Sequence, residues 1–248
     1  MISAIIGGTG CQRIVGDDAL RHEISTPYGL AVVFERKRGD DTLYLLLRHG
    51  EGHVVPPHLV NYRANIAALK QLGVTQAIGI YAVGSITSVV LPGTLGIMDQ
   101  FIDFTGGGRE ATFFTGNGSG VRHIPMVAPF SSRLRAALIK EAARMSVSIA
   151  TKGTYVCTNG PRLETPAEIG MFRRWGADYV GMTAATETIL ANETGIEFAG
   201  TVYSINWAAG LDAEGLSFIE DEISDRIIDR LTTLVEGALS VTFAQPGH

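Results

Sequence analysis

The chain has 248 residues, of which 46% are hydrophobic and 18% are charged, and its formal net charge is −5. This composition excludes a disordered chain, and the acidic balance with no basic run argues against nucleic-acid binding. The length suits one α/β domain that spans residues 1–248 and has a substantial buried core.

The cysteines and the N-terminal residues indicate a compartment. Cys11 and Cys157 form no C-x-x-C pair and no disulfide framework, which favours a reducing environment. The first residues carry no charged segment and reach glycines after a few apolar positions, which is too short for a signal peptide or a membrane span. We therefore expect a cytoplasmic protein that associates with neither membranes nor nucleic acids.

Short apolar runs predict the strands of a buried sheet. In chain order they are 2–6, 43–47, 76–81, 94–98, 178–182 and 199–205. Amphipathic segments with one apolar face predict helices over 59–72, 130–145 and 221–239. This alternation predicts an α/β fold with its ligand groups at the carboxyl ends of strands.

Two further helix starts and one loop can be read from the sequence. Thr165 precedes Pro166 and lies three residues before Glu168, which is the pattern of a capping box. Thr183 directly follows a predicted strand and is a second plausible helix entrance. The glycine-rich segment 105–120 is expected to be a long surface loop.

Four segments after predicted strands could bind phosphate. Residues 7–10, Gly-Gly-Thr-Gly, could turn successive backbone N–H groups toward an anion, although a plain tight turn would look the same. Arg48 and His49 offer a guanidinium and an imidazole, unless they are only a surface pair. Thr183 lies at a helix N-terminus, where it may simply be a cap, and residues 82–85 could contribute backbone amides.

A metal site is not expected. His49 and His53 are four residues apart, as zinc ligands on a helix would be, but glycines at 50 and 52 make a helix there improbable. No carboxylate completes an H-E-x-x-H arrangement, and the cysteines are remote in sequence. We therefore predict neither a metal nor an organic cofactor.

Taken together, the motifs resemble those of the methylthioadenosine/purine nucleoside phosphorylase family. They follow one another in unbroken order from residue 5 to about residue 210: IIGGTG at 5–10, LLLRHG at 45–50, VNYRANIAALK at 60–70, AVGS at 82–85, DQFIDFT at 99–105, HIPM at 123–126, GPRLET at 160–165 and GMTAATETILANE at 181–193. The resemblance implies a pentosyltransferase of purine salvage. It also implies a single α/β domain around a mixed, partly barrel-like sheet flanked by helices, assembled as a homotrimer.

The resemblance also implies roles for individual residues. Phosphate, the co-substrate, would be held by Thr9, Arg48, His49, the backbone of Ala82, and Thr183. Met182 would lie against the ribose, and His123 resembles a histidine that reaches the 5′ end of a neighbouring subunit's substrate. Leu163 stands where relatives have a phenylalanine against the base, so stacking on the base should be weaker here.

The base site distinguishes the two classes of purine. A 6-oxopurine presents an N1–H donor and an O6 acceptor, whereas adenine presents the reverse pattern. Glu164 accepts hydrogen bonds when ionised and therefore suits N1–H, and the Asn206 amide can donate to O6 or N7. Family members that cleave adenine nucleosides carry serine at the position of Glu164 and Asp-x-Asp at 206–208. The glutamate and asparagine found here are those of members acting on hypoxanthine and guanine nucleosides.

The 5′ group of the substrate is read from the segment after Asn206. Phosphorylases of inosine and guanosine use a histidine there, but this chain has no histidine between Asn206 and Phe243. It has an apolar set suited to a methylthio group, unless these residues only pack the last helix: Leu216, Phe218, Ile219 and Ile223. S-methyl-5′-thioinosine is therefore the expected substrate, ahead of inosine and guanosine, with methylthioadenosine third.

His49 and Asn206 are the expected catalytic residues. His49 helps to hold the phosphate nucleophile beneath C1′, while Asn206 hydrogen-bonds N7 of the departing purine. Two rival readings remain. A dinucleotide-dependent oxidoreductase is disfavoured because the glycine loop lacks the third fingerprint glycine. A non-catalytic nucleoside or phosphate sensor would carry the same binding residues.

Overall fold

The computed structural model describes residues 2–116, 118, 120–213 and 215–243. Its strands are β1 (Ile2–Gly7), β2 (Leu20–Thr26), β3 (Gly29–Arg38), β4 (Asp41–Leu47), β5 (Gln76–Ser85), β6 (Leu95–Ile97), β7 (Gln100–Asp103), β8 (Thr154–Cys157), β9 (Tyr179–Gly181) and β10 (Glu197–Trp207). Its helices are α1 (Tyr62–Gln71), α2 (Ser132–Arg144), α3 (Pro166–Arg174), α4 (Ala184–Thr194) and α5 (Asp221–Phe243), with short 3-10 turns at Cys11–Ile14 and Pro57–Leu59.

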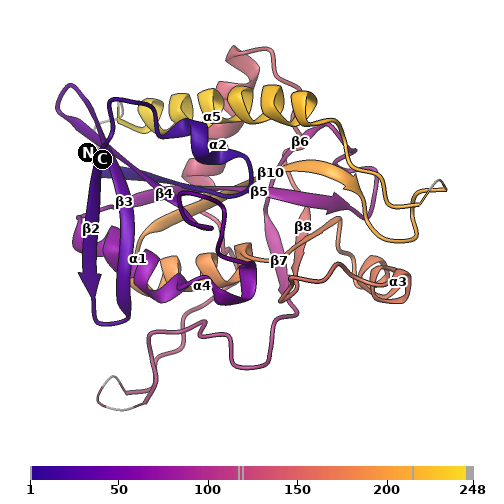
Figure 1. Cartoon of the computed structure of the whole chain (residues 1–248), viewed down its shortest axis with the longest axis horizontal. Coiled ribbons are helices and arrows are strands. Elements are labelled where there is room, and N and C mark those ends of the chain that lie inside the picture. The colour runs from indigo at the N-terminus through magenta and orange to yellow at the C-terminus, as the bar shows by residue number, and fades with distance from the viewer. Residues whose placement is uncertain (1, 117, 119, 214, 244–248) are drawn as a thin grey trace.

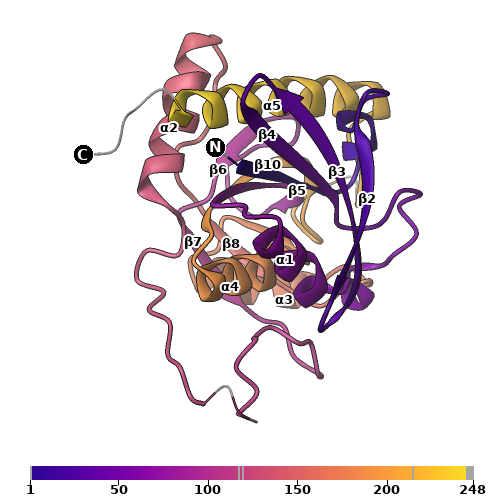
Figure 2. The same ribbon diagram turned by 90° about the vertical axis from the view of Figure 1, so that its left-hand side faces the viewer.

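The strands form one mixed sheet between two helical layers. Figures 1 and 2 show α2 and α5 on one face and α1 and α4 on the other. Each face carries its own buried apolar cluster: Ile66, Leu69 and Leu190 lie in one, and Leu138, Leu231 and Leu234 in the other. A third, smaller cluster packs α3 against β8 and β9. The predicted α/β fold with a mixed sheet flanked by helices is confirmed.

Side-chain caps define several helix starts. The Thr165 hydroxyl accepts from the N–H of Glu168, while the Glu168 carboxylate accepts from the N–H of Thr165 at 2.8 Å. Asn61 caps α1 and Ser131 caps α2 in the simpler one-way form. The predicted capping box is therefore confirmed, and side-chain caps mark the starts of α1, α2 and α3.

Strand pairing places the ligand-binding edge. Strands β4, β1, β5 and β10 are parallel neighbours, so their carboxyl ends meet at one edge of the sheet. Two strands share one edge of β5. Strand β1 pairs with it in parallel as far as Gly79, and β9 pairs with it in the antiparallel direction from Gly84. The stretch of β5 between these two pairings therefore faces a gap in the sheet.

Several predicted elements need correction. The strand expected over 76–81 runs on to Ser85, so residues 82–85 belong to β5 rather than to a loop after it. The hairpin β2–β3 was not predicted, because β2 alternates between exposed and half-buried residues and both strands carry charged residues. The short strands β7 and β8 were also missed. The expected helix start at residue 59 falls in a 3-10 turn, and α1 begins at Tyr62.

The long glycine-rich segment projects from the body of the molecule. In Figures 1 and 2 the chain between β7 and α2 descends below the sheet as irregular backbone. Glu193 of α4 anchors this segment at Thr112 and Phe113: its carboxylate accepts from the Thr112 hydroxyl and from the Phe113 N–H, both at 2.7 Å. Within the described residues, no helix is long and apolar enough to cross a bilayer.

Candidate active site

A cavity of about 580 Å³ opens at the carboxyl edge of the parallel strands. It gathers residues from the ends of β1, β4, β5, β9 and β10 and from the loops beside them. Ten of the predicted site residues line it: Thr9, Arg48, His49, Ala82, Leu163, Glu164, Met182, Thr183, Asn206 and Phe218. A cavity of this size is ample for a nucleoside together with an anion.

The gap beside β5 explains why an arginine enters this edge. The carbonyl of Ile80 has no strand partner on the gap side and accepts from Nη1 of Arg48 at 3.1 Å. Alternate residues of a strand direct their backbone groups to the same side, so the N–H of Ala82 faces the same gap as Ile80. A backbone amide and a guanidinium therefore lie side by side at this end of the cavity, which we call the anion end.

Arg48 is held almost completely by buried partners. It is 3% exposed, and Nε and Nη2 donate to the two carboxylate oxygens of Glu187 at 2.6 and 2.8 Å. Nη2 also donates to the carbonyl of Ile6 at 3.3 Å. With the bond to Ile80, four of the five guanidinium N–H groups have partners, and one on Nη1 remains beside Gly8. A Cβ at Gly8 would collide with Nη1, so glycine is required there.

Tyr81 and Glu187 complete this buried network. The Tyr81 hydroxyl donates to Glu187 at 2.6 Å, and the Arg48 guanidinium lies 4.4 Å from the centre of the Tyr81 ring. Burial acts to lower the pKa of Arg48, but the charge and hydrogen bonds of Glu187 outweigh it and raise that pKa. Arg48 is therefore a fixed cation whose charge is largely balanced by its own partner.

His49 presents one ring nitrogen to the cavity in a defined form. Its Nδ1 lies 2.8 Å from the carbonyl of Val55, which can only accept, so Nδ1 carries the proton. Burial, followed by the charge of Arg48, lowers the pKa of His49 to about 4. At neutral pH the imidazole is therefore uncharged, and its Nε2 offers a lone pair rather than the N–H expected from the sequence.

The threonines at the anion end contribute hydroxyl groups. Thr183 caps α4 without a side-chain hydrogen bond, and its N–H donates to the Tyr155 hydroxyl at 3.3 Å. Thr9 is exposed in the turn after β1, where the Tyr203 hydroxyl donates to its carbonyl at 2.8 Å.

Glu164 lines the same cavity from the turn before α3, and we call the part of the cavity that Glu164 and Asn206 line the base end. It is 9% exposed, and the Thr158 hydroxyl donates to its Oε1 at 2.7 Å. Burial raises the pKa of Glu164, while the hydrogen bond from Thr158 opposes that rise by favouring the carboxylate. A buried acceptor of this kind suits a ligand that brings an N–H donor.

Asn206 lines the cavity from the end of β10. A register shift between Ser204 and Asn206 precedes it, and the side chain is 6% exposed. Its Nδ2 donates to the carbonyl of Trp207 at 2.7 Å, which fixes the amide plane and leaves one N–H on Nδ2 for a ligand. The structure thus brings Glu164 and Asn206 to one cavity, although they are far apart in sequence.

The rim of the cavity is apolar and exposed. Leu163, Leu216 and Phe218 line it, with 45%, 46% and 54% of their surface exposed. Two members of the expected apolar set, Ile219 and Ile223, do not line the cavity in this structure. Instead, the backbone N–H of Ile219 donates to the carbonyl of Ile205 at 2.8 Å and anchors the rim to β10.

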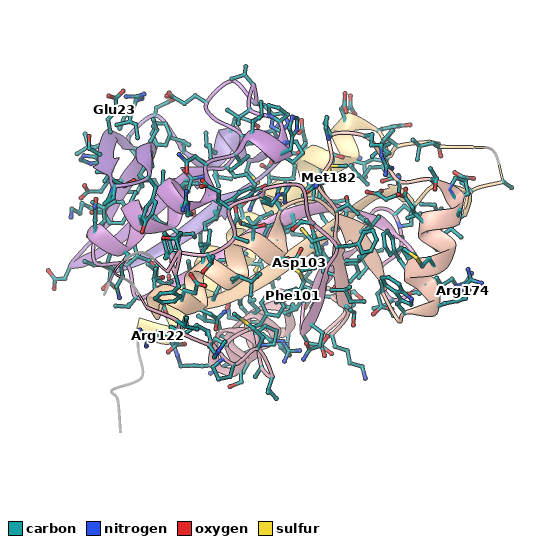
Figure 3. The ribbon with its side chains drawn as sticks, turned by 90° about the horizontal axis from the view of Figure 1, so that it is seen from below. Glu23, Phe101, Asp103, Arg122, Arg174 and Met182 are labelled. Atoms are coloured by element: carbon teal, nitrogen blue, oxygen red, sulfur yellow. The ribbon has the colours of Figure 1, made fainter. Side chains whose placement is uncertain are left out.

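Met182 and His123 occupy very different places. Met182 lies near the middle of the molecule when it is seen from below (Figure 3), and its carbonyl accepts from Nη1 of Arg109 at 2.6 Å. Arg109 also donates to the carbonyl of Asn159 at 2.8 Å, so it ties the projecting segment to this wall. His123 is exposed on that segment and does not line the cavity of its own chain.

The sequence reasoning missed three residues of the site. His53 lines the cavity, and its ring lies tilted with its centre 4.7 Å from that of His49; the pair was considered only as metal ligands. Tyr81 and Glu187 were given no role. The position of Glu187 in the first turn of a helix that follows a strand could have indicated that it lies near the carboxyl edge of the sheet. Among the described residues, no group of three or more His, Cys, Asp or Glu side chains could hold a metal ion.

Comparison with known proteins agrees with this geometry. The family model described as "Phosphorylase superfamily" matches residues 4–240. A protein of Xanthomonas campestris pv. campestris named "Probable S-methyl-5'-thioinosine phosphorylase" is 44% identical over 222 residues, covering 88% of each chain. A "6-oxopurine nucleoside phosphorylase" of Pyrococcus furiosus is 41% identical over 222 residues, covering 88% of this chain and 83% of the relative.

A solved structure extends the likeness over the whole fold. A methylthioadenosine phosphorylase from Schistosoma mansoni in complex with tubercidin has a TM-score of 0.91 at 29% identity, covering 99% of this chain and 93% of that one. The predicted family and fold are therefore both confirmed. The chain belongs to the phosphorylase superfamily.

Proposed function

We propose that the chain catalyses the phosphorolysis of 6-oxopurine nucleosides, with S-methyl-5′-thioinosine preferred and hypoxanthine and 5-methylthioribose 1-phosphate as products. One observation carries the proposal: a single cavity joins an anion end, with Arg48 and the Ala82 amide, to a base end with Glu164 and Asn206. Two relatives at 44% and 41% identity bear names that fit this activity.

Phosphate would bind beneath C1′ as the nucleophile. The free N–H of Arg48, the Ala82 amide and the hydroxyls of Thr9 and Thr183 are its donors. The neutral His49 accepts a hydrogen bond on Nε2 from the P–OH group of hydrogen phosphate, which leaves the unprotonated oxygens to attack. Because Glu187 balances the charge of Arg48, the anion keeps enough negative charge to stabilise the oxocarbenium-like sugar.

The leaving purine would be stabilised at the base end. As the N9–C1′ bond breaks, negative charge spreads to N7 and O6, and the remaining N–H of Asn206 donates to this edge. Glu164 accepts from N1–H, a contact that adenine cannot make because its N1 carries no hydrogen. The reaction needs phosphate as co-substrate and no metal or organic cofactor.

The apolar rim favours a methylthio group at the 5′ position. Val54, Leu216 and Phe218 line the cavity there, and burying a methylthio group against them removes apolar surface from water. His53, which precedes Val54 and also lines the cavity, could hydrogen-bond a 5′-hydroxyl and so favours inosine and guanosine as secondary substrates.

The assembly proposed with this function is a cytoplasmic homotrimer. His123 is exposed on the projecting segment and lies outside its own cavity, so it is free to reach the 5′ end of a substrate bound by a neighbouring subunit. Met182 lines the chain's own cavity, where it would lie against the ribose.

The proposal is tested by product stoichiometry. The protein is incubated with methylthioinosine and phosphate, and hypoxanthine and methylthioribose 1-phosphate are measured together. We expect equal amounts of both products, and no base release without phosphate. Release without phosphate would identify a hydrolase, and saturable nucleoside binding with no release would identify a sensor. Either result overturns the proposal.

A further inference from the structure

A second cavity adjoins the base end of the first. Its volume is about 280 Å³, and its walls are Phe104, Thr158, Asn159, Gly160, Arg162, Glu164 and Glu168. Among the residues that the structure describes, Glu164 alone lines both cavities. Because the Thr158 hydroxyl that binds Glu164 belongs to the second cavity alone, the carboxylate stands on the boundary between the two spaces.

The orientation of a bound purine follows from its two anchors. This step rests on the proposed function, with Glu164 at N1 and Asn206 at the O6 and N7 edge. On the purine ring, C2 is the neighbour of N1 on the side away from C6. The second cavity is lined by Glu164 but not by Asn206, so it lies on the side toward which C2 points.

We infer that this second cavity is a subsite for substituents on the 2-amino group of guanine, and that N2-alkylated and N2-arylmethylated guanine nucleosides are substrates. A singly substituted amine keeps one N–H on the N1 side, which donates to Glu164. The substituent then extends from the other side of the nitrogen into the cavity.

The walls of the subsite suit an aromatic substituent. Phe104 is 44% exposed, and its ring packs edge-on against Phe172 and Trp175 with ring centres 5.1 and 5.7 Å apart. Arg162 forms an ion pair with Glu168 at 2.7 Å, which keeps a planar cation near the cavity without leaving its charge unpaired. An aromatic ring beside Phe104 and this guanidinium gains favourable ring and cation contacts.

The inference is tested by comparing guanosine with N2-methylguanosine and N2-benzylguanosine under saturating phosphate. We expect both substituted nucleosides to be cleaved with kcat/KM within about tenfold of guanosine, because a substituent that enters a preformed space costs little. N2,N2-dimethylguanosine is the matched control. Its second methyl group removes the N2–H donor and crowds the Glu164 carboxylate beside N1–H, so we expect at least about a hundredfold loss relative to N2-methylguanosine.

A wall variant tests where the benzyl group lies. Phe104→Ala removes the aromatic wall and should lower kcat/KM for N2-benzylguanosine by about tenfold while guanosine cleavage is unchanged. Phe104→Leu keeps an apolar side chain of similar size and shows whether loss of packing, rather than of the ring, causes the change. Guanosine turnover in both variants verifies that they fold.

The outcomes separate this inference from the function on which it rests. Cleavage of guanosine with rejection of N2-benzylguanosine by more than about a hundredfold would overturn the subsite alone. Equal loss of both substrates in Phe104→Ala would do the same. If neither guanosine nor inosine releases its base, the proposed function itself fails, and the subsite fails with it.

Discussion

The two ends of the cavity are built in opposite ways. At the anion end, Arg48 is 3% exposed and hydrogen-bonded to Glu187, to Ile80 and to Ile6. At the rim, Leu216 and Phe218 are 46% and 54% exposed and lie on the loop between β10 and α5. The groups proposed to act on phosphate are fixed by the sheet, whereas those proposed to select the 5′ group are carried by a loop.

This difference suggests how one fold can serve several nucleosides. A pre-organised anion end needs no rearrangement when phosphate binds, which favours turnover. A loop-borne rim can change its side chains without disturbing the buried network, because surface loops tolerate substitution better than the elements they connect. Glu164 and Asn206 are intermediate. Both residues are nearly buried, yet the side chain of each makes a single hydrogen bond to a neighbouring residue: Glu164 accepts from Thr158, and Asn206 donates to Trp207.

The largest effect is expected where the anion end is most buried. Glu187→Gln removes the charge that balances Arg48 and leaves a buried cation without its partner. We expect the free energy of unfolding to fall by about 3–5 kcal/mol, measured by urea denaturation. Glu23→Gln is the matched control, since the Glu23 pair with Arg21 is exposed and should contribute about 1 kcal/mol or less. Equal effects from the two variants would contradict the contrast between the ends.

Asn206→Ala should mainly reduce turnover. The Asn206 amide is used as charge develops on the purine, so we expect kcat to fall by roughly a hundredfold to a thousandfold with a much smaller change in the nucleoside KM. Steady-state kinetics with methylthioinosine measure both constants. Near-normal kcat in this variant would show that Asn206 is not the leaving-group donor.

Glu164→Gln should change which purine is preferred. The Gln amide can both donate and accept, so the variant loses part of its match to N1–H and gains a donor for the N1 atom of adenine. We expect kcat/KM for methylthioinosine to fall by about tenfold to a hundredfold, and the value for methylthioadenosine to hold or rise. A parallel loss on both substrates would mean that Glu164 does not read the N1 edge.

His49 should make the fold less stable in mild acid. Its pKa is about 4 in the folded chain against an ordinary value of 6.5, so between these values the unfolded chain binds a proton that the folded chain does not. Stability should therefore fall as the pH is lowered from 6.5 toward 4, by up to about 1 kcal/mol per pH unit after solvent screening. Urea denaturation at several pH values should show a shallower dependence in His49→Gln. An unchanged slope would contradict the lowered pKa.

Much of the site could be predicted because chain order and strand ends determine it. The runs at 2–6, 43–47 and 199–205 became β1, β4 and β10, and the polar groups at or just beyond their ends meet in one cavity. Local chemistry also predicted the capping box at Thr165, since three neighbouring residues suffice to form it.

The contacts that the sequence did not reveal are long-range or depend on backbone detail. Arg48 and Glu187 are 139 residues apart, and nothing near either residue identifies its partner. The proton position on His49 depends on the Val55 carbonyl, which only the folded turn brings within 2.8 Å. The gap beside β5 depends on where β1 and β9 stop pairing, which no apolar pattern records.

The most direct measurement of the central claim is the ratio of kcat/KM for methylthioinosine to that for methylthioadenosine at a fixed phosphate concentration. The two substrates differ only at the purine edge that Glu164 and Asn206 are proposed to bind. The contributions of the sugar, the 5′ group and the anion end are therefore the same for both and cancel in the ratio. The account predicts a ratio above about ten, because each mismatched buried contact costs about tenfold or more. A ratio below one would contradict it.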